Sequence, residues 1–560
     1  MEDRELQKKN WIIFFAGLIG IVLFSIWKAK FGFGGKDVSF YLTTPYRISL
    51  GDKWFLDDWN LAQLSSFITY PLVKLYVGIV GSTEGIMISF RYIYILVNFL
   101  ITIYIYSKLR EFGLSAIIAM WIYFLFVPFN NMMLSYNTMG MMFGFIACII
   151  IAYNQTNSLI KYGVAGFFFA MTVLCQPLLA GVFIIGAIYI LVKRRANKKY
   201  LGAFTVGCII PAIPIFVYAF CVVGFNNIIE NIPYMTMEMG VEHGFNGTIN
   251  WLKDMVMILF PKRVYNIWGI CVNSVYVFCV LYIVAILLII LFVVRKHKSE
   301  NYKSFIKVIL VYNVVYDLMA VATWKTNSIN IVLLPIIIGG IVCYKYGDNA
   351  KLKILFKWTF LWGIAHIIGY LTSNGGMAVY SVALFPLSII SLVYVLYELK
   401  DDKIFIAISA MFIILSIIII RGCALFQDKS IFVLDTRIKY GPAKNIVVEK
   451  EQKEEYDIVW KNAKILEKNG DKICILSAHT WMYLMMDKRT LEYGTYMPYT
   501  IELVLKNNGN YFKRRNVSPD IIYIDDEYAE TMNLDKSLKE IGITQYRIEK
   551  MQKGVAIYVQ

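Results

Sequence analysis

Long apolar segments recur along this 560-residue chain, and they constrain its fold more than any other feature. Segments of about 17–25 residues are long enough to cross the hydrocarbon core of a bilayer. Hydrophobic residues make up 58% of the sequence and the mean hydropathy is +0.58, above the range of soluble domains. The pattern predicts a mainly α, polytopic membrane helical bundle with about thirteen spans. We expect them near residues 11–27, 87–107, 114–128, 138–153, 162–176, 178–192, 201–223, 268–294, 305–321, 328–344, 355–371, 376–397 and 403–420.

Basic residues fall in alternate short loops between these segments and set the expected orientation. The net charge is +16, and the positive-inside rule assigns the basic loops to the cytoplasm. Residues 11–27 follow a charged start but lack a small-residue cleavage site, so we predict a retained span. The N-terminus is then cytoplasmic, and the chain from about residue 421 lies outside the cell membrane. The excess of basic residues indicates how the chain is oriented in the membrane, and it gives no support for a nucleic-acid partner.

Three regions outside the spans are long enough to hold structure. Within the transmembrane module, residues 1–420, the first exterior loop at 31–86 shows helical spacing and predicts two short amphipathic helices broken at Pro71. Residues 224–266 are polar and predict a mobile exterior lid loop. Residues 421–560 have ordinary composition and predict a small exterior α/β domain. Its expected strands are 472–476, 519–524 and 554–559, and its expected helices lie near 450–468 and 526–541.

Carboxylates gather just outside the first predicted span. Because ionised side chains at a bilayer edge are costly to desolvate, these acids are candidates for function. Asp37 comes first and could act as a general base, or it could be a solvated residue at the helix end. Asp57 and Asp58 follow, and either could cap a helix that starts at Trp59, orient an acceptor, or share a metal with Asp37. We favour Asp58 for the site and Asp57 for the cap.

Basic residues at two exterior positions are candidates for binding a phosphate. Arg91 opens the second span, and Lys262 with Arg263 follows Pro261 where the chain re-enters the membrane. A guanidinium can contact a phosphate at two points, which favours such a role for Arg91. Each of the three side chains could instead reach up to the lipid headgroups.

Motifs for metals and nucleotides are missing from the sequence. Most of the nine cysteines lie within predicted spans, and none has the spacing of a zinc site, so no metal is expected. His243 in the lid loop is not enough to predict a ligand set. Glycine-rich phosphate loops are also missing, which argues against a nucleotide-driven pump.

The order of these features resembles the GT-C superfamily of integral-membrane glycosyltransferases. The resemblance is to the branch with the protein O-mannosyltransferases and the lipid A aminoarabinose transferases. It covers roughly the first 110 residues by motif and the rest by architecture. The residues that carry it are Asp37-x-x-x-Tyr41, Gly51, Asp58-Trp59, Tyr70-Pro71-Leu72, Gly81 and Arg91.

The resemblance implies a sugar donor carried on polyprenyl phosphate and a catalytic base in the first exterior loop. By position that base is Asp37, and Asp58 matches the second acid of the loop. Many members carry an acid pair at the first position, whereas Val38 follows Asp37 here. A single carboxylate is a poor site for a divalent ion, so no cofactor is expected, although a divalent metal stays possible. Tyr70 stands where many members have proline, so the resemblance does not identify the acceptor.

We therefore expect a glycosyltransferase that moves a sugar from a polyprenyl-phosphate donor to a cell-envelope acceptor at the exterior face. The acceptor would be a glycan, a lipid or a protein. In an inverting displacement, Asp37 would deprotonate the acceptor, and Arg91 with Lys262 or Arg263 would stabilise the leaving phosphate. The main alternative is a multi-span transporter or lipid-linked glycan flippase without catalysis. That alternative predicts charges paired in mid-bilayer and pseudo-symmetric halves.

Overall fold

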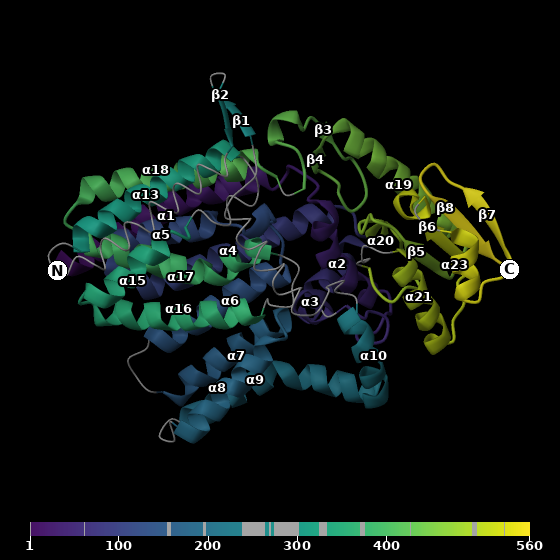
Figure 1. The fold of residues 1–560 in the computed structure, drawn as a ribbon, viewed down its shortest axis with the longest axis horizontal. Helices are drawn as coiled ribbons and strands as arrows, with labels where there is room; N and C mark the ends of the chain where they lie inside the picture. Colours follow the sequence, from purple (N-terminus) through teal and green to yellow (C-terminus); the bar gives the residue numbers. More distant parts are fainter. Residues whose placement is uncertain are drawn as a thin grey trace.

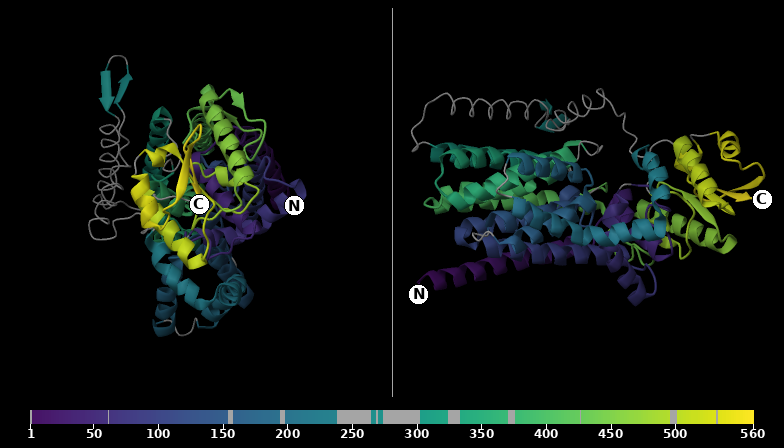
Figure 2. Two further views of the ribbon diagram at one scale, coloured as in Figure 1. Left: turned by 90° about the vertical axis from the view of Figure 1, so that its right-hand side faces the viewer. Right: turned by 90° about the horizontal axis from the view of Figure 1, so that it is seen from below.

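Long helices packed side by side make up most of the molecule, and a small sheet lies at one end (Figure 1). The N-terminus and the C-terminal sheet lie at opposite ends of the helical bundle (Figure 2). The computed structural model describes residues 2–60, 62–153, 158–193, 198–237, 264–267, 270–273, 302–323, 333–369, 376–425, 427–495, 501–530 and 533–560.

Helices occupy most of the segments that were predicted as spans. Among the described residues, five helical segments are long and apolar enough to cross a membrane: Arg4–Lys28, Ile86–Phe112, Tyr136–Tyr153, Lys198–Val223 and Lys403–Cys423. A membrane location is therefore supported, whereas the number of thirteen spans stays a prediction. The bundle helices are α1 (Glu2–Lys28), α4 (Ile86–Leu109), α5 (Leu114–Leu125), α6 (Tyr136–Tyr153), α7 (Leu159–Cys175), α8 (Leu179–Lys193), α9 (Lys198–Tyr218), α13 (Tyr302–Thr323), α15 (Ile336–Tyr346), α16 (Ala350–Gly369), α17 (Gly376–Glu398) and α18 (Lys403–Cys423).

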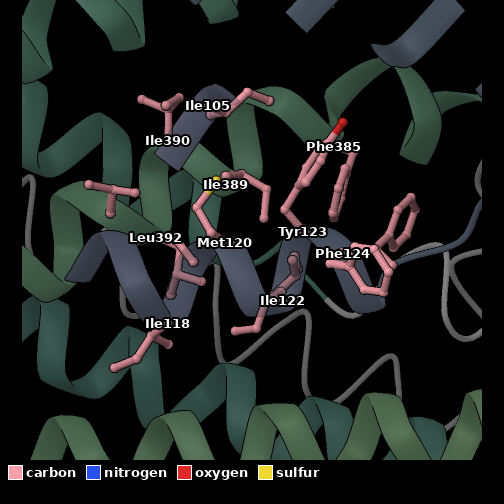
Figure 3. Close-up of a cluster of buried hydrophobic side chains, with 14 of the residues drawn as sticks. Ile105, Ile118, Met120, Ile122, Tyr123, Phe124, Phe385, Ile389, Ile390 and Leu392 are labelled. Carbon is pink, nitrogen blue, oxygen red and sulfur yellow. The ribbon is translucent and has the colours of Figure 1, made fainter. Parts of the chain in front are cut away.

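Helix α5 forms the centre of the bundle. It packs against α1, α4, α17 and α18, and its side chains are buried around almost the whole helix. Figure 3 shows Met120 and Tyr123 of α5 among isoleucines of neighbouring helices, with Phe385 of α17 beside them. The rings of Phe126 and Phe385 stack at 3.7 Å between centroids. A helix that is apolar on every face needs such a position, because it has no side to present to water.

Helices α8 and α9 instead leave large apolar side chains uncovered. Ile185 on α8 is 71% exposed and Val206 on α9 is 61% exposed. Isolated apolar residues on a protein surface are normal, but a continuous exposed apolar face indicates an apolar surrounding or a partner. These faces support contact with lipid.

Residues 31–86, the predicted first exterior loop, hold two helices as predicted, but the limits of these helices differ from the prediction. They are α2 (Gly35–Ser49) and α3 (Gln63–Val80). Pro71 lies inside α3, so the predicted break there is wrong. Proline removes only one N–H from the helix, and the packing of α3 against α2 and α7 compensates for that loss. No helix begins at Trp59.

Residues 224–273 contain more regular structure than was predicted. Helix α10 (Phe225–Met237) replaces the first part of the expected lid loop. Strands β1 (Val264–Ile267) and β2 (Ile270–Asn273) pair antiparallel, so part of the span predicted at 268–294 is a strand. The remainder of that span and residues 238–263 lie outside the described residues.

The C-terminal region contains a four-stranded sheet in the order β5-β6-β8-β7. Strands β5 (Ile473–Leu476) and β6 (Ile521–Ile524) are parallel and buried throughout, and β8 (Val555–Val559) and β7 (Tyr546–Lys550) extend the sheet antiparallel. The three predicted strands and the helix near 450–468 are confirmed, whereas the helix expected at 526–541 is divided in two. The remaining elements are α19 (Lys450–Asn469), α20 (Met482–Met485), α21 (Ile501–Arg515), α22 (Asp526–Ala529), α23 (Leu534–Glu540), β3 (Thr436–Arg437), β4 (Val447–Val448), the 3-10 helices Arg110–Phe112, Pro128–Asn130 and Ile431–Val433, and the π-helix Ala219–Val223.

Candidate functional site

Asp37 lies in the first turn of α2, shortly after the long apolar helix α1 ends at Lys28. Gly34 and Gly35 have φ angles of 83° and 57°, a left-handed conformation that lets the chain turn sharply from α1 into α2. The Asp37 carboxylate is half-buried and accepts a hydrogen bond from Gln427 Nε2 at 3.4 Å. A carboxylate at a helix N-terminus is stabilised by the helix dipole. Asp37 is therefore both held and accessible, as a general base requires.

Aromatic and amide side chains surround Asp37 on the bundle side. Tyr136, at the start of α6, is close enough to Asp37 for the two groups to interact electrostatically. The ring of Tyr41, one helical turn after Asp37, packs edge-on against Tyr136 with 5.6 Å between centroids. The carboxylate thus sits where α2, α6 and the segment after α18 meet.

Arg91 is buried near the start of α4, and backbone carbonyl groups accept its hydrogen bonds. Its Nη1 donates to the carbonyl of Ala29 at 2.8 Å, and its Nη2 donates to those of Gly32 at 2.8 Å and Phe33 at 3.2 Å. These carbonyls belong to the end of α1 and the following turn. Arg91 therefore fixes the chain that leads into α2, and its predicted contact with a donor phosphate stays a prediction.

A small cavity lies beside this turn. It is lined by backbone and side chains of α1, α2 and α4, of the 3-10 turn after α5, and of the segment after α18. The lining residues are Lys28, Phe31, Gly32, Gly34, Val38, Arg91, Asn130, Asn131, Met132, Leu425 and Asp428. This cavity shares two neighbouring segments with Asp37. They are the segments around residues 130–137 and 425–428.

Asp428 holds the segment after α18 against the turn between α1 and α2. Its Oδ2 accepts the Gly34 N–H at 2.7 Å, and its Oδ1 accepts Gln452 Nε2 at 3.0 Å. Sequence reasoning missed Asp428, because a lone acid in a polar linker carries no signal of a contact almost 400 positions away.

Asp57 is fully buried and does not cap a helix, so that prediction is wrong. Its Oδ2 accepts the Lys53 N–H at 2.8 Å, which closes a tight turn. Its Oδ1 accepts Tyr511 Oη at 2.9 Å and pairs with Arg515 Nε at 2.9 Å and Arg489 Nη2 at 3.0 Å. All three partners belong to the C-terminal region. Asp57 therefore attaches the segment between α2 and α3 to the C-terminal region.

Arg47 extends this ionic cluster. Its Nε pairs with Asp52 Oδ2 at 2.5 Å, and its Nη1 pairs with Glu492 Oε1 at 2.8 Å. Asp52 also pairs with Arg489. Arg47 and both acids are buried, so the pairs are protected from water and salt. Trp59 adds apolar contact, since its ring is buried among core residues of the C-terminal region.

Asp58 is buried beside α2 on the same side of that helix as Asp37. Its Oδ2 accepts Thr44 Oγ1 at 2.8 Å, and its Oδ1 accepts the Asn60 N–H at 2.9 Å. Asp37 and Thr44 are seven residues apart on one helix face, a rise of roughly 10 Å. Burial raises the pKa of Asp58 to about 6, against the lowering effect of the hydrogen bond from Thr44.

Replacing Asp58 by asparagine should flatten the pH dependence of stability. Because the folded-state pKa lies above the usual value, the folded protein binds the proton more tightly, and stability falls as pH rises from about 4 to about 6. The cost of the buried charge above pH 6 is on the order of 3 kcal/mol. An asparagine can keep both hydrogen bonds, because Thr44 can also accept.

The measurement is the apparent melting temperature in detergent between about pH 5 and about pH 8. The wild type should melt at a higher temperature at the acidic end, by a margin that Asp58→Asn reduces. Asp401, with a side chain 78% exposed, provides the control variant Asp401→Asn, which should retain the wild-type slope. Equal slopes for Asp58→Asn and the wild type would contradict the assignment.

Lys262, Arg263 and His243 lie outside the described residues, so their predicted roles stay predictions. Within the described part of the chain, no group of three or more histidine, cysteine or acidic side chains has the geometry of a metal site.

Comparison with protein-family models, with curated proteins and with solved structures finds no match.

Proposed function

We propose that this protein is an integral-membrane glycosyltransferase of the GT-C type. It would move a sugar from a polyprenyl-phosphate donor to a cell-envelope acceptor at the exterior face. The observation that carries this proposal is the position of Asp37, a half-buried carboxylate at the end of the first span, next to a cavity with a basic lining.

The carboxylate suits the removal of the acceptor proton, and the positive groups of the cavity suit the departure of the phosphate. A carboxylate can accept the proton of the acceptor hydroxyl as that oxygen attacks the anomeric carbon. The bond to the phosphate then breaks, and negative charge develops on the leaving oxygen. Positive groups placed beforehand stabilise that charge without reorganisation. Lys28 and Arg91 at the cavity provide such charge, and Lys262 with Arg263 remain candidates for more.

A lipid-linked donor is also supported by the bundle surface. Between α1 and α4 lies an apolar groove of about 470 Å³, lined by Val22, Ile26, Tyr92, Ile95, Leu96 and Phe99. The same two helices carry Lys28 and Arg91. A prenyl chain can lie against such a surface while its phosphate stays near the bilayer edge.

Asp58 has a supporting role in this proposal. Its two hydrogen bonds fix the loop after α2 against Thr44, and so it shapes the surface that continues from Asp37. Asp57 faces the C-terminal region instead, and we assign it no contact with substrate.

The direct test is transfer by the full chain in lipid nanodiscs. Prenyl-phosphate sugars with a labelled sugar should transfer label to a cell-envelope fraction, whereas nucleotide sugars should not. If no prenyl-phosphate sugar is consumed, while labelled lipid crosses the bilayer in proteoliposomes, the protein is a flippase and the proposal is wrong.

A further inference from the structure

Lys28, the last residue of α1, lines the cavity beside the turn from α1 into α2. The side chain is 1% exposed. Within the described part of the chain, no hydrogen bond or ion pair reaches this ammonium. A buried charge without a partner is costly, and proteins normally pair such groups. Among the described residues, the charge of Asp428 attracts the ammonium of Lys28, but no direct ion pair joins the two groups.

The neighbouring charges make the cavity more positive. Arg91 and Arg421 are both close enough to Lys28 to repel its charge. Both guanidinium groups donate to backbone carbonyls, Arg91 to the turn after α1 and Arg421 to Leu125 at 3.3 Å. Asp428 is the opposing acid, and its two oxygens already accept Gly34 N–H and Gln452 Nε2. The ammonium of Lys28 thus retains free donors in a cavity with a net positive lining.

We propose that this cavity is an oxyanion subsite in which Lys28 binds one terminal oxygen of a phosphate group. The free volume is about 10 Å³, which is the space for one water-sized atom. It therefore accommodates a single phosphate oxygen, with the rest of the phosphate outside the cavity. Charge-assisted hydrogen bonds from an ammonium to an oxyanion are among the strong ones.

The phosphate belongs to a prenyl lipid in this proposal. This choice rests on the proposed function, in which a prenyl phosphate is the leaving group. The apolar groove between α1 and α4 supports it, because the helices that form the groove also carry Lys28 and Arg91. Lys28 then explains how the leaving phosphate is held although the hydrogen-bond donors of Arg91 are occupied by carbonyls.

The test is the binding of farnesyl phosphate to the full chain in detergent micelles, measured by calorimetry. Lys28→Met should raise the Kd at least tenfold. The matched control is Lys30→Met, the same substitution two residues later at an exposed side chain, which should keep the wild-type Kd. Farnesol should bind equally to all three proteins, because it lacks the anion. Equal affinity of the wild type and Lys28→Met for farnesyl phosphate overturns the proposal.

Further measurements distinguish a loss of binding from a loss of folding, and a lipid-linked phosphate from free phosphate. Lys28→Met removes a buried charge that has no direct ion pair, so its melting temperature without ligand should not fall. Farnesyl phosphate should raise the melting temperature of the wild type and of Lys30→Met by similar amounts, and that of Lys28→Met by less. Lys28→Arg, which keeps the charge, should retain part of the affinity. Binding of inorganic phosphate as tight as that of farnesyl phosphate would overturn the lipid assignment.

The outcome for the Lys28 subsite can also be distinguished from the outcome for the proposed transferase function. If farnesyl phosphate binding depends on Lys28 but no prenyl-phosphate sugar is consumed, the subsite is supported and the transferase proposal fails. If sugar transfer occurs while Lys28→Met binds and reacts like the wild type, the transferase is supported and the subsite is overturned.

Discussion

Asp37→Asn should reduce sugar transfer by about 10²–10⁴-fold, the usual contribution of a positioned general base. An amide cannot accept the proton of the acceptor hydroxyl, although it has nearly the same shape as the carboxylate. The fold should be unaffected, because asparagine can also accept the hydrogen bond from Gln427 Nε2. The measurement is the initial rate with a labelled prenyl-phosphate sugar in nanodiscs.

Two further variants make this prediction specific. Asp37→Glu keeps a carboxylate at a changed distance and should recover part of the activity. Glu451→Gln, the same loss of charge at a side chain 86% exposed, should transfer at the wild-type rate. Folded Asp37→Asn protein with full activity would remove Asp37 from the mechanism.

Asp57→Ala should have the largest effect on stability, at about 3 kcal/mol. Removing one member of a buried ionic cluster leaves its partners uncompensated, which typically costs 3–5 kcal/mol. We expect the lower end of this range, because Arg489 and Arg515 are 35% and 28% exposed and can recover some hydration. The loss should appear as weaker attachment of the C-terminal region to the segment between α2 and α3.

Hydrogen exchange at Trp59 reports this attachment directly. Its backbone N–H donates to the carbonyl of Tyr493 at 2.7 Å, across the contact between the two regions. Asp57→Ala should lower the protection of this amide about 100-fold, the equivalent of about 3 kcal/mol. Glu540→Ala breaks a surface pair in which both side chains are more than half exposed, and it should leave the protection unchanged. Unchanged protection in Asp57→Ala would show that apolar contacts alone hold the regions together.

Asp37 and Asp57 show how far sequence reasoning extends to a site. The position of Asp37 after the first span followed from the length of the apolar run, and the structure places Asp37 at the start of a helix there. The prediction for Asp57 failed, because its partner Tyr511 lies 454 positions away. A local pattern such as two acids before an apolar run favours a cap, and it contains no information about so distant a partner.

Pro71 and Lys28 are two further residues whose surroundings a local sequence pattern does not predict. Proline is a reliable breaker in an isolated helix, but α3 keeps it because neighbouring helices stabilise the segment. A lysine at the end of a long apolar segment, such as Lys28, usually extends its ammonium group to water. Its burial depends on Arg91, Asn131 and the segment after α18, which no local pattern reports.

The sequence by itself determined the helical bundle, the membrane-compatible lengths of several helices and the strands of the C-terminal sheet. These features are properties of contiguous segments, since span length and apolar periodicity are set by the residues within each segment. Only the tertiary structure decided which acid is accessible, which acids form the buried cluster and which basic residue faces the cavity. Those outcomes depend on contacts between residues far apart in the chain, where burial and neighbouring charge change what a side chain can do.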